Sequence, residues 1–460
     1  MSTINSKTIP GSFRDPAGFL FLKNGILYRQ INSIYKENYD HLSTSGLYKT
    51  LIEDNLLISH KEVAFHNAHS DGGYKIIEPE VIPFISYPYE WCFSQFKDTA
   101  LLTLEIQKKA LEFGMSLKDA SAYNVQFRNG KPVWIDTLSF EIYNENEPWV
   151  AYRQFCQHFL APLALMSFKD IRLSQLLKTF IDGIPLDLTS ELLPFQTYFR
   201  SSLLSHLHLH ARSQKYFANK SVNARHAKIS RFALRGLIDN LESAVKNLKW
   251  NREDTPWANY YQDTNYSSEA SLHKEKVVNS FLTILKPKIV WDLGANTGKY
   301  DRILSIQNTQ TIAYDNDPVA VEKNYLSCKR EGVKNILPLY MDITNPSAPL
   351  GWENNERMSL LERAPADTVL ALAIVHHLAI SHNVPLEKIA HFFAKLCKSL
   401  IIEFVPKSDS NVQRLLSARK DIFPQYTQHS FETAFQQYFK ISHTERIEDS
   451  ERVLYCMEKI

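Results

Sequence analysis

The 460-residue sequence is poor in glycine and lacks long apolar runs and any excess of charge of one sign. It has 14 glycines, and none gather with serine into a flexible linker, so we expect its domains to pack directly together. The formal net charge of +2 gives no global field that would favour nucleic acid or a membrane surface. The most apolar stretch, residues 155–168, contains His158 and is too short to span a bilayer, and the first residues form no apolar signal core.

The cysteine content excludes further classes of protein. The five cysteines are Cys92, Cys156, Cys328, Cys397 and Cys456. None are spaced as metal-ligand pairs, and a disulfide framework would be unusual here, so we expect a reducing, cytoplasmic location. If Ser205–His210 were a strand, three imidazoles would share one face and could bind a metal, but no cysteine or acid lies at ligand spacing. We therefore predict no metal site.

What is present is an ordinary globular composition, with 44% apolar and 22% charged residues. The length predicts two domains, each large enough to bury its own core. Helical patterns end before residues 251–261, and Pro256 in this segment indicates a domain boundary. We expect an N-terminal arm at 1–16, a first domain at 17–250 and a second domain at 251–460.

The second domain contains a strand, a tight turn and a helix in succession. Apolar residues 289–291 predict a buried strand, Asp292 follows it, and residues 300–306 can start a helix. The turn between them contains Gly294, Asn296 and Gly298. Glycine lets the backbone approach a ligand closely, and a positive φ costs it little. A strand, a glycine-containing turn and a helix together are typical of a nucleotide-binding βα unit.

Four further strand signals follow, each with a polar residue near its end. Residues 311–315 end in Asp315, 23 residues after Asp292, where a carboxylate can accept hydrogen bonds from both ribose hydroxyls of an adenosine ligand. The other three signals are residues 337–342, 367–378 and 399–405, and helical segments separate them. Strands alternating with helices predict an α/β domain with a parallel sheet.

These motifs resemble those of class I S-adenosylmethionine-dependent methyltransferases over residues 256–460. The similar features are the D-x-G-x-N-x-G form of the first motif, the acids after the second and third strands, and His-His-Leu at the end of the fourth. The resemblance implies a Rossmann-like seven-stranded domain with S-adenosyl-L-methionine as its cofactor. It implies that Asp315 binds the ribose and that Asp342, with Ile343 beside it, binds the adenine amino group. The methionine end and the backbone contacts would fall to Asp292, Gly294, Asn296 and Gly298.

The acceptor side is less defined by the sequence. His376 and His377 end the fourth strand, and one of them is a candidate general base because histidine titrates near neutrality. The alternative is that they only shape the pocket, and Glu403 is a further candidate base. The fourth-strand segment lacks the Asp/Asn-Pro-Pro-Tyr/Phe motif of amino-methyltransferases that act on nucleic-acid bases, so we do not expect a nucleic-acid substrate. Aromatic residues ahead of the domain either cover the cofactor and acceptor or pack the domain seam: Trp257, Tyr260, Tyr261 and Tyr266.

The first domain begins with strand and helix signals. Residues 18–31 predict a hairpin around Asn24-Gly25, and residues 35–55 have helical periodicity that Gly46 weakens. A strand at 74–77 and an amphipathic helix at 94–113 follow.

Asp119, Asn124 and Asp136 then appear in the order of the catalytic segment of protein-kinase-like and aminoglycoside-phosphotransferase-like folds. That resemblance implies an α+β kinase-like domain in which the first acid receives a hydroxyl proton and the other two residues hold Mg²⁺. No Gly-rich phosphate loop or V-A-I-K lysine precedes them, and Arg29 stands where a strand cation would. We therefore expect no phosphotransfer. An active small-molecule phosphotransferase remains an alternative, as does a structural role in which Asp119 caps a turn and Asn124 satisfies loop backbone.

Segments along most of the chain resemble the bacterial nodulation-protein-related methyltransferase-like family. They are Tyr-Pro-Tyr-Glu-Trp at 87–91, Ser-Leu-Lys-Asp-Ala-Ser-Ala-Tyr-Asn at 116–124, and the segment at 149–163. The resemblance implies methyl transfer, and we expect O-methylation of a small molecule or glycan. A bifunctional protein and a non-enzymatic scaffold that binds the cofactor are the other hypotheses. The sequence does not predict an oligomeric state.

Overall fold

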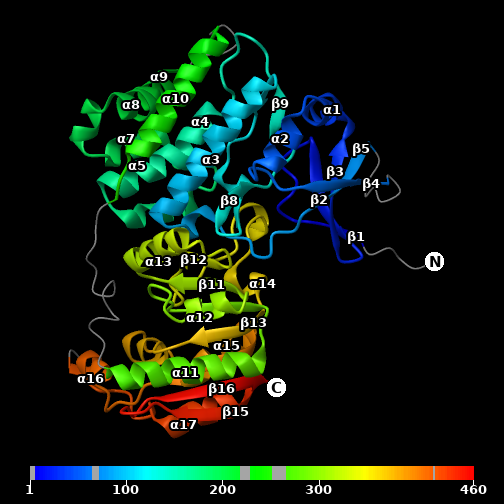
Figure 1. Ribbon diagram of the computed structural model, residues 1–460. Coiled ribbons are helices and arrows are strands. Elements are labelled where there is room, and N and C mark those ends of the chain that lie inside the picture. The colour runs from blue at the N-terminus through cyan, green and yellow to red at the C-terminus, as the bar shows by residue number, and fades with distance from the viewer. Residues whose placement is uncertain (1–5, 65–71, 218–227, 251–265, 418–419) are drawn as a thin grey trace. The chain divides into compact units, whose positions relative to one another are not determined.

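The computed structural model describes residues 6–64, 72–217, 228–250, 266–417 and 420–460. The chain divides into two compact units (Figure 1). Unit 1 is Met1–Asn251 together with Pro349–Arg357, and unit 2 is Arg252–Ala348 together with Met358–Ile460. A short segment from the C-terminal half of the sequence is thus part of unit 1, which the sequence did not predict.

Unit 1 begins with an antiparallel five-stranded sheet in the order β1-β2-β3-β5-β4. The predicted hairpin joins β2 to β3, and both Asn24 (φ 53°) and Gly25 (φ 80°) adopt the positive φ that a tight two-residue turn requires. The strands are β1 Ser6–Thr8, β2 Gly18–Lys23, β3 Ile26–Asn32, β4 His60–Val63 and β5 Gly73–Pro79.

The helical pattern at 35–55 forms two helices. α1 (Lys36–Thr44) and α2 (Leu47–Glu53) are separated at Gly46, whose φ of 94° interrupts the helical backbone. The apolar residues that give this pattern its periodicity, Tyr39, Leu42, Leu47 and Leu51, are all buried. The amphipathic helix is confirmed as α3, Phe93–Glu112.

The remainder of unit 1 contains two short strand pairs and a series of helices. β6 (Met115–Leu117) pairs with β9 (Phe140–Ile142), and β7 (Val125–Arg128) forms a hairpin with β8 (Lys131–Trp134). The helices are α4 Tyr152–Phe155, α5 Ala161–Phe168, α6 Leu176–Thr179, α7 Leu186–Leu192, α8 Ser201–Leu203, α9 His210–Phe217 and α10 Arg231–Asn247.

The histidine-rich segment is not a strand. Residues Leu204–Leu209 form a π-helix, so His206 and His208 do not line up on the face of a strand. Both are buried and hydrogen-bonded, and their partners are Tyr152, Asn240, Ser190 and Thr197. These histidines satisfy polar groups of the core, and within the described ranges no three His, Cys, Asp or Glu side chains form a metal-binding group.

Unit 2 is built on a seven-stranded sheet in the order β12-β11-β10-β13-β14-β16-β15. The first five strands of that order are parallel, and β16 is antiparallel to both β14 and β15. This confirms the predicted Rossmann-like α/β fold. The strands are β10 Ile289–Leu293, β11 Gln310–Asp315, β12 Ile336–Tyr340, β13 Ala366–Ala371, β14 Cys397–Phe404, β15 Phe439–Arg446 and β16 Val453–Lys459.

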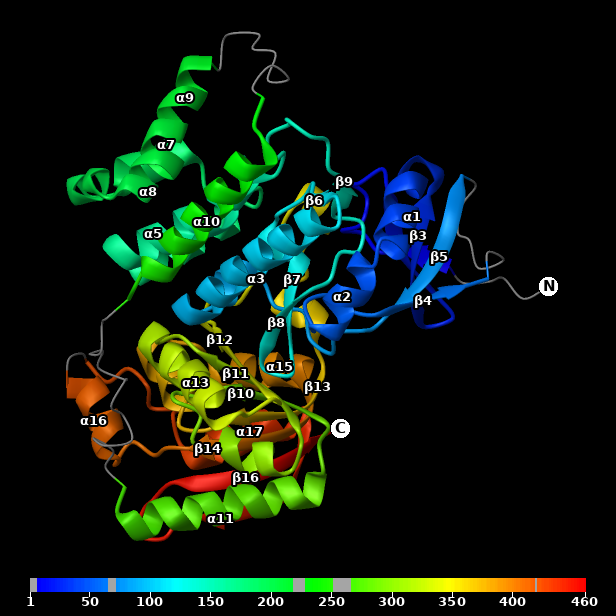
Figure 2. The ribbon, with the colours of Figure 1, turned by 45° about the horizontal axis from the view of Figure 1, so that its top comes forward.

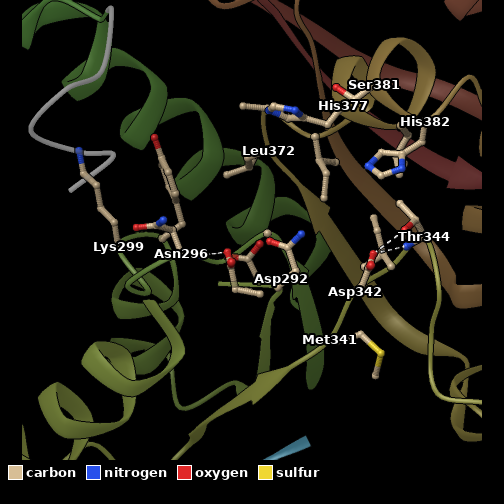
Figure 3. A pocket seen from close by; sticks show the side chains of 18 of the residues that line it. Asp292, Asn296, Lys299, Met341, Asp342, Thr344, Leu372, His377, Ser381 and His382 are labelled. Atoms are coloured by element: carbon tan, nitrogen blue, oxygen red, sulfur yellow. Dashed lines mark hydrogen bonds between the residues drawn. The ribbon is translucent and has the colours of Figure 1, made fainter. Parts of the chain in front are cut away.

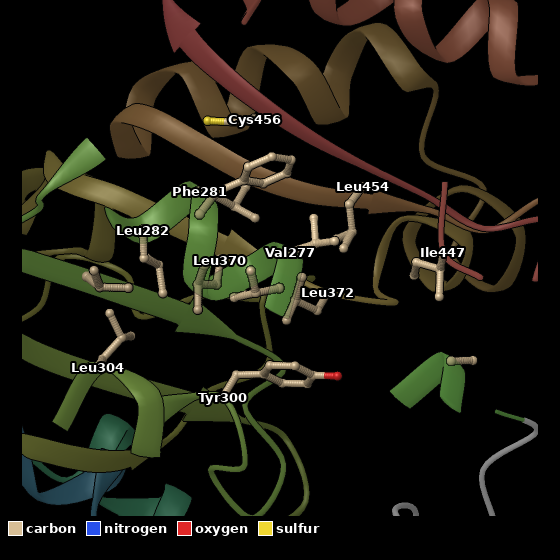
Figure 4. Close-up of a cluster of buried hydrophobic side chains, with 14 residues drawn as sticks. Val277, Phe281, Leu282, Tyr300, Leu304, Leu370, Leu372, Ile447, Leu454 and Cys456 are labelled. Atoms are coloured by element: carbon tan, nitrogen blue, oxygen red, sulfur yellow. The ribbon is translucent and has the colours of Figure 1, made fainter. Parts of the chain in front are cut away.

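Helices cover this sheet, and one of them contributes to the main core of unit 2. α11 lies along β16 in two views (Figure 1, Figure 2). Its Val277 and Phe281 join a buried cluster with Leu370, Leu454 and other strand residues (Figure 4). The helices are α11 Ser268–Leu285, α12 Asp301–Ile306, α13 Pro318–Glu331, α14 Leu360–Arg363, α15 Leu386–Leu396, α16 Ser410–Ser417 and α17 Gln428–Gln436.

The fourth strand of the predicted series is shorter than the sequence pattern suggested. β13 ends at Ala371, and Ala373 has a φ of 53°, a conformation that only glycine adopts without strain. The chain then forms a π-helix at His377–Ser381. His376 and His377 therefore follow the strand instead of ending it, because the apolar run 372–375 turns away from the sheet.

Candidate functional site

Unit 2 contains a cavity of about 390 Å³ beyond the carboxyl ends of β10, β11, β12 and β13. In an open α/β sheet, ligands bind at this edge, and a cavity of this volume holds a small organic molecule. Figure 3 shows Asp292 between Lys299 on one side and Asp342 on the other. The lining also includes Tyr266, Ser271, Lys274, Gly294, Asn296, Tyr300, Asp315, Ile343, Leu372, Ala373, His377 and His382.

The turn after β10 forms the floor of this cavity. Gly294 and Gly298 have φ values of 87° and 80°, and Asn296 has a φ of 51°. A Cβ atom at Gly298 would come within 2.4 Å of Asn324 Oδ1, so no larger residue fits without displacing that side chain. The sequence motif is thus required both by backbone conformation and by close packing.

Asp315, at the end of β11, is held by the turn. Its Oδ2 accepts a hydrogen bond from the backbone N–H of Asn296 and its Oδ1 accepts one from Asp317, each at 2.8 Å. Burial raises the pKa of Asp315 to about 6. Each carboxylate oxygen can accept a further hydrogen bond, so the side chain can receive two vicinal hydroxyl groups from a ligand in the cavity.

Asp342 follows β12 and lines the cavity with Ile343. Its Oδ1 accepts hydrogen bonds from the backbone N–H (2.8 Å) and the hydroxyl (2.6 Å) of Thr344 (Figure 3). Within the described part of the chain, Oδ2 has no hydrogen-bond partner. Asp342 is therefore oriented by Thr344 and can accept a hydrogen bond from a ligand amino group.

A buried ion network, which the sequence did not predict, lies beside the site, and only its Lys274 and Tyr266 line the cavity. Lys274 Nζ lies 2.6 Å from Glu403 Oε2, and both side chains are almost fully buried. Arg452 lies 3.6 Å from Glu403 and 2.7 Å from Asp409, and the Tyr266 hydroxyl donates to Glu403. Burial acts to raise the pKa of Glu403, but Lys274 and Arg452 outweigh it and lower that pKa. Glu403 is thus an ionised structural partner for two cations and does not line the cavity.

The structure separates the two candidate histidines. His377 lines the cavity and is half-buried, whereas His376 is 3% exposed and is not part of the lining. Burial lowers the pKa of His377 to about 4 and lowers that of His376 well below its usual range. Both imidazoles are therefore neutral near pH 7, and His377 can contact a ligand.

The aromatic segment ahead of the domain is described only in part. Tyr266 lines the cavity, next to the buried Lys274. The other three aromatics of that prediction, Trp257, Tyr260 and Tyr261, lie outside the described residues. The sequence reasoning did not identify Ser271, Lys274 and Lys299. The sequence did not predict α11, and a lysine in such a segment gives no local signal that it will line a cavity.

Unit 1 brings its three predicted polar residues together. Asn124 donates to the hydroxyl of Ser139 (3.2 Å), which in turn donates to Asp136 (2.8 Å), and burial and the Asp136 charge raise the pKa of Asp119. Asp136 also forms an ion pair with Arg29. Burial acts to raise the pKa of Asp136, but Arg29 and hydrogen bonds outweigh it and lower that pKa. The charge of Asp136 is thus already compensated by Arg29, a side chain of the same unit.

Comparison with known proteins gives one relative along the whole chain. Nodulation protein NoeA of Rhizobium meliloti (strain 1021) is 33% identical over 460 residues, which covers 98% of this chain and 96% of that protein. The chain belongs to the NoeA family. No protein-family model matches it.

Solved structures resemble this NoeA-family chain over less than half of its length. Magnesium protoporphyrin IX methyltransferase (ChlM) from Synechocystis PCC 6803, determined with bound SAH, is 17% identical and has a TM-score of 0.31; it matches 44% of this chain and 93% of its own. A SAM-dependent methyltransferase from Aquifex aeolicus is 15% identical with a TM-score of 0.30, over 45% of this chain and 100% of its own. Among the described residues, no helix is long and apolar enough to cross a membrane.

Proposed function

We propose that this member of the NoeA family is an S-adenosyl-L-methionine-dependent methyltransferase. The observation that carries the proposal is the convergence of three acids on one cavity. Asp292, Asp315 and Asp342 come from, or directly follow, β10, β11 and β12, and all three line it. The three neighbouring strands thus present an acid each along the edge of the sheet where nucleotide-like ligands bind.

The polar groups of this cavity fit the parts of the cofactor. Asp315 accepts hydrogen bonds from the ribose hydroxyls, and Asp342 accepts one from the adenine amino group beside Ile343. On the side of Asp292 away from Asp342, Asp292 faces the ammonium group of the methionine part, and Lys299 supplies a cation for its carboxylate. Gly294 and Asn296 bring the backbone of the turn close to the ligand, whereas the predicted Gly298 does not line the cavity and packs against Asn324.

When bound, the cofactor supplies an electrophilic methyl group, and the protein must hold an acceptor oxygen in line with it. The acceptor would lie near His377, in the part of the cavity where Leu372 also lies (Figure 3). His377, with a pKa lowered to about 4, is unprotonated at neutral pH and can accept a hydrogen bond from an acceptor hydroxyl, but it is a weaker base than the near-neutral histidine that the sequence suggested. His376 packs against His377, with ring centroids 4.2 Å apart, and positions it.

The acceptor class we infer is a small molecule or glycan methylated on oxygen. Tyr266 offers a flat ring and the neutral His377 a hydrogen-bonding group to a ring that bears hydroxyls. The net charge of +2 gives no electrostatic field that would attract nucleic acid. We place the protein in the cytoplasm because its five cysteines are free and buried.

Methyl-labelled cofactor and fractionated cell extract test this proposal. We expect label in the small-molecule or lipid fraction. Label found only in RNA or protein would contradict the acceptor class and leave methyl transfer intact. Cofactor binding without label in any fraction would favour a non-enzymatic scaffold. The control is the Asp315→Asn variant in the same extract, because it should transfer little label.

The second candidate function concerns unit 1. We propose that it is a kinase-like domain that does not transfer phosphate, because Arg29 neutralises Asp136, the acid that would hold Mg²⁺ in such folds. A guanidinium so close to this carboxylate competes directly with a divalent cation. Asp119 and Asn124 remain beside it as polar groups that could bind a hydroxyl-bearing molecule.

A further inference from the structure

A buried acid pair lies at the cavity end of β10. Asp292, which lines the cavity, is 2% exposed, and Asp301, the first residue of α12, is 0% exposed. Their carboxyl groups are in contact with each other. Two buried carboxyl groups in contact repel each other when both are ionised and no cation compensates them, so the contact indicates that the pair holds a proton in the free protein.

The surroundings of Asp301 do not compensate a second negative charge. Its Oδ2 accepts a long hydrogen bond of 3.3 Å from Asn324. Its Oδ1 accepts no hydrogen bond from any residue that the structure describes. The nearest guanidinium, Arg302, donates to Asn324 and to Glu331. A proton on Asp292 would therefore give Asp301 its remaining hydrogen bond.

The groups that face Asp292 from the neighbouring elements also favour its protonated form. They are Asp301 from α12, Asp315 from β11 and Lys274 from α11. Lys274 Nζ lies 2.6 Å from Glu403 Oε2, so its positive charge is compensated by Glu403 and stabilises an ionised Asp292 only weakly. Burial, then Asp301 and Asp315, raise the pKa of Asp292 well above its usual range, and burial raises that of Asp301 to about 6.

We propose that Asp301 keeps a proton on Asp292 in the free protein and that cofactor binding expels it to the solvent. This inference rests on the proposed function. The ammonium group of the cofactor replaces the proton as the partner of Asp292, which then binds as a carboxylate while Asp301 stays ionised beside it. Asp301 touches no ligand: it is a positioning residue that makes the site prefer a cation and makes binding depend on pH.

The sign of this dependence follows from linkage. A proton released on binding makes the affinity rise with pH, by up to tenfold per pH unit, until the free pair has lost its proton. The Asp301→Asn variant can donate an amide N–H to Asp292, which should then be ionised already. Its cofactor affinity should change little with pH. The amino group of the cofactor titrates equally in both proteins, so the difference between their profiles reports the acid pair.

Calorimetry of the full-length protein with S-adenosyl-L-methionine tests the proposal, at pH 7 in two buffers of different ionisation enthalpy and then from pH 6 to 7.5. We expect the wild-type protein to release close to one proton and the Asp301→Asn variant to release almost none. The matched control is Asp367→Asn, because a hydrogen bond from Lys398 lowers the pKa of Asp367 and it carries no proton at pH 7. This variant should release as many protons as the wild type.

Cofactor binding by the wild type without proton release would overturn the inference and leave the proposed function standing. Equal release by the wild type and the Asp301→Asn variant would also overturn it. No cofactor binding at any pH would refute the proposed function and the inference together. The wild-type measurement decides the first case by itself, so the test does not depend on the variant being folded.

Discussion

Replacing Asp315 by asparagine isolates the ribose contact of the proposed cofactor site. The aspartate already accepts two backbone hydrogen bonds, from Asn296 and Asp317, and can accept two more from a ribose. The substitution removes the charge and places an amide NH₂ against one of those N–H groups. Hydrogen bonds to charged groups contribute about 1.5–3 kcal/mol each, so we expect a loss of about 2–3 kcal/mol in cofactor binding.

This loss corresponds to a dissociation constant raised about 30- to 150-fold, measured by calorimetry with S-adenosyl-L-methionine. Thermal unfolding of the free variant establishes that it is folded. The matched control is Asp317→Asn. Asp317 caps α13 by accepting hydrogen bonds from Val319 and Ala320 and does not line the cavity, so its replacement should leave the affinity within twofold. Undiminished binding by folded Asp315→Asn protein would refute the ribose assignment.

Three further predictions follow from buried or strained groups. Glu403→Leu leaves the buried Lys274 without its carboxylate partner and Arg452 with Asp409 alone, and should reduce the free energy of unfolding in urea by about 3 kcal/mol, whereas Lys398→Ala, in a surface pair, should change it by less than about 1 kcal/mol. Equal effects would contradict the role of the buried network. Ala373→Gly relieves a positive φ and should raise the stability by about 0.5–1 kcal/mol; a loss of stability would show that the Ala373 conformation is not strained. Purified protein should hydrolyse no ATP with Mg²⁺, because Arg29 neutralises Asp136; hydrolysis that disappears in Asp136→Ala would show an active phosphotransferase.

The sequence determined the local framework of both units. The apolar runs, the turn with Gly294 and Gly298 and the spacing from Asp292 to Asp315 predicted β10, β11 and the edge at which they meet. These features depend on residues close together in the chain, whose backbone preferences and periodicity act before any tertiary contact forms. The hairpin at Asn24-Gly25 was predictable for the same reason.

Only the tertiary structure decided which polar side chains meet and which remain charged. Lys274 and Glu403 are 129 residues apart, and the local sequence around either residue gives no sign that the other is its partner. The same holds for Arg29 and Asp136. The charge on such groups depends on burial and on the partner across the core, and these are set by packing between elements. A carboxylate in the sequence is therefore a candidate for many roles, and the fold selects one by fixing its neighbours and its access to water.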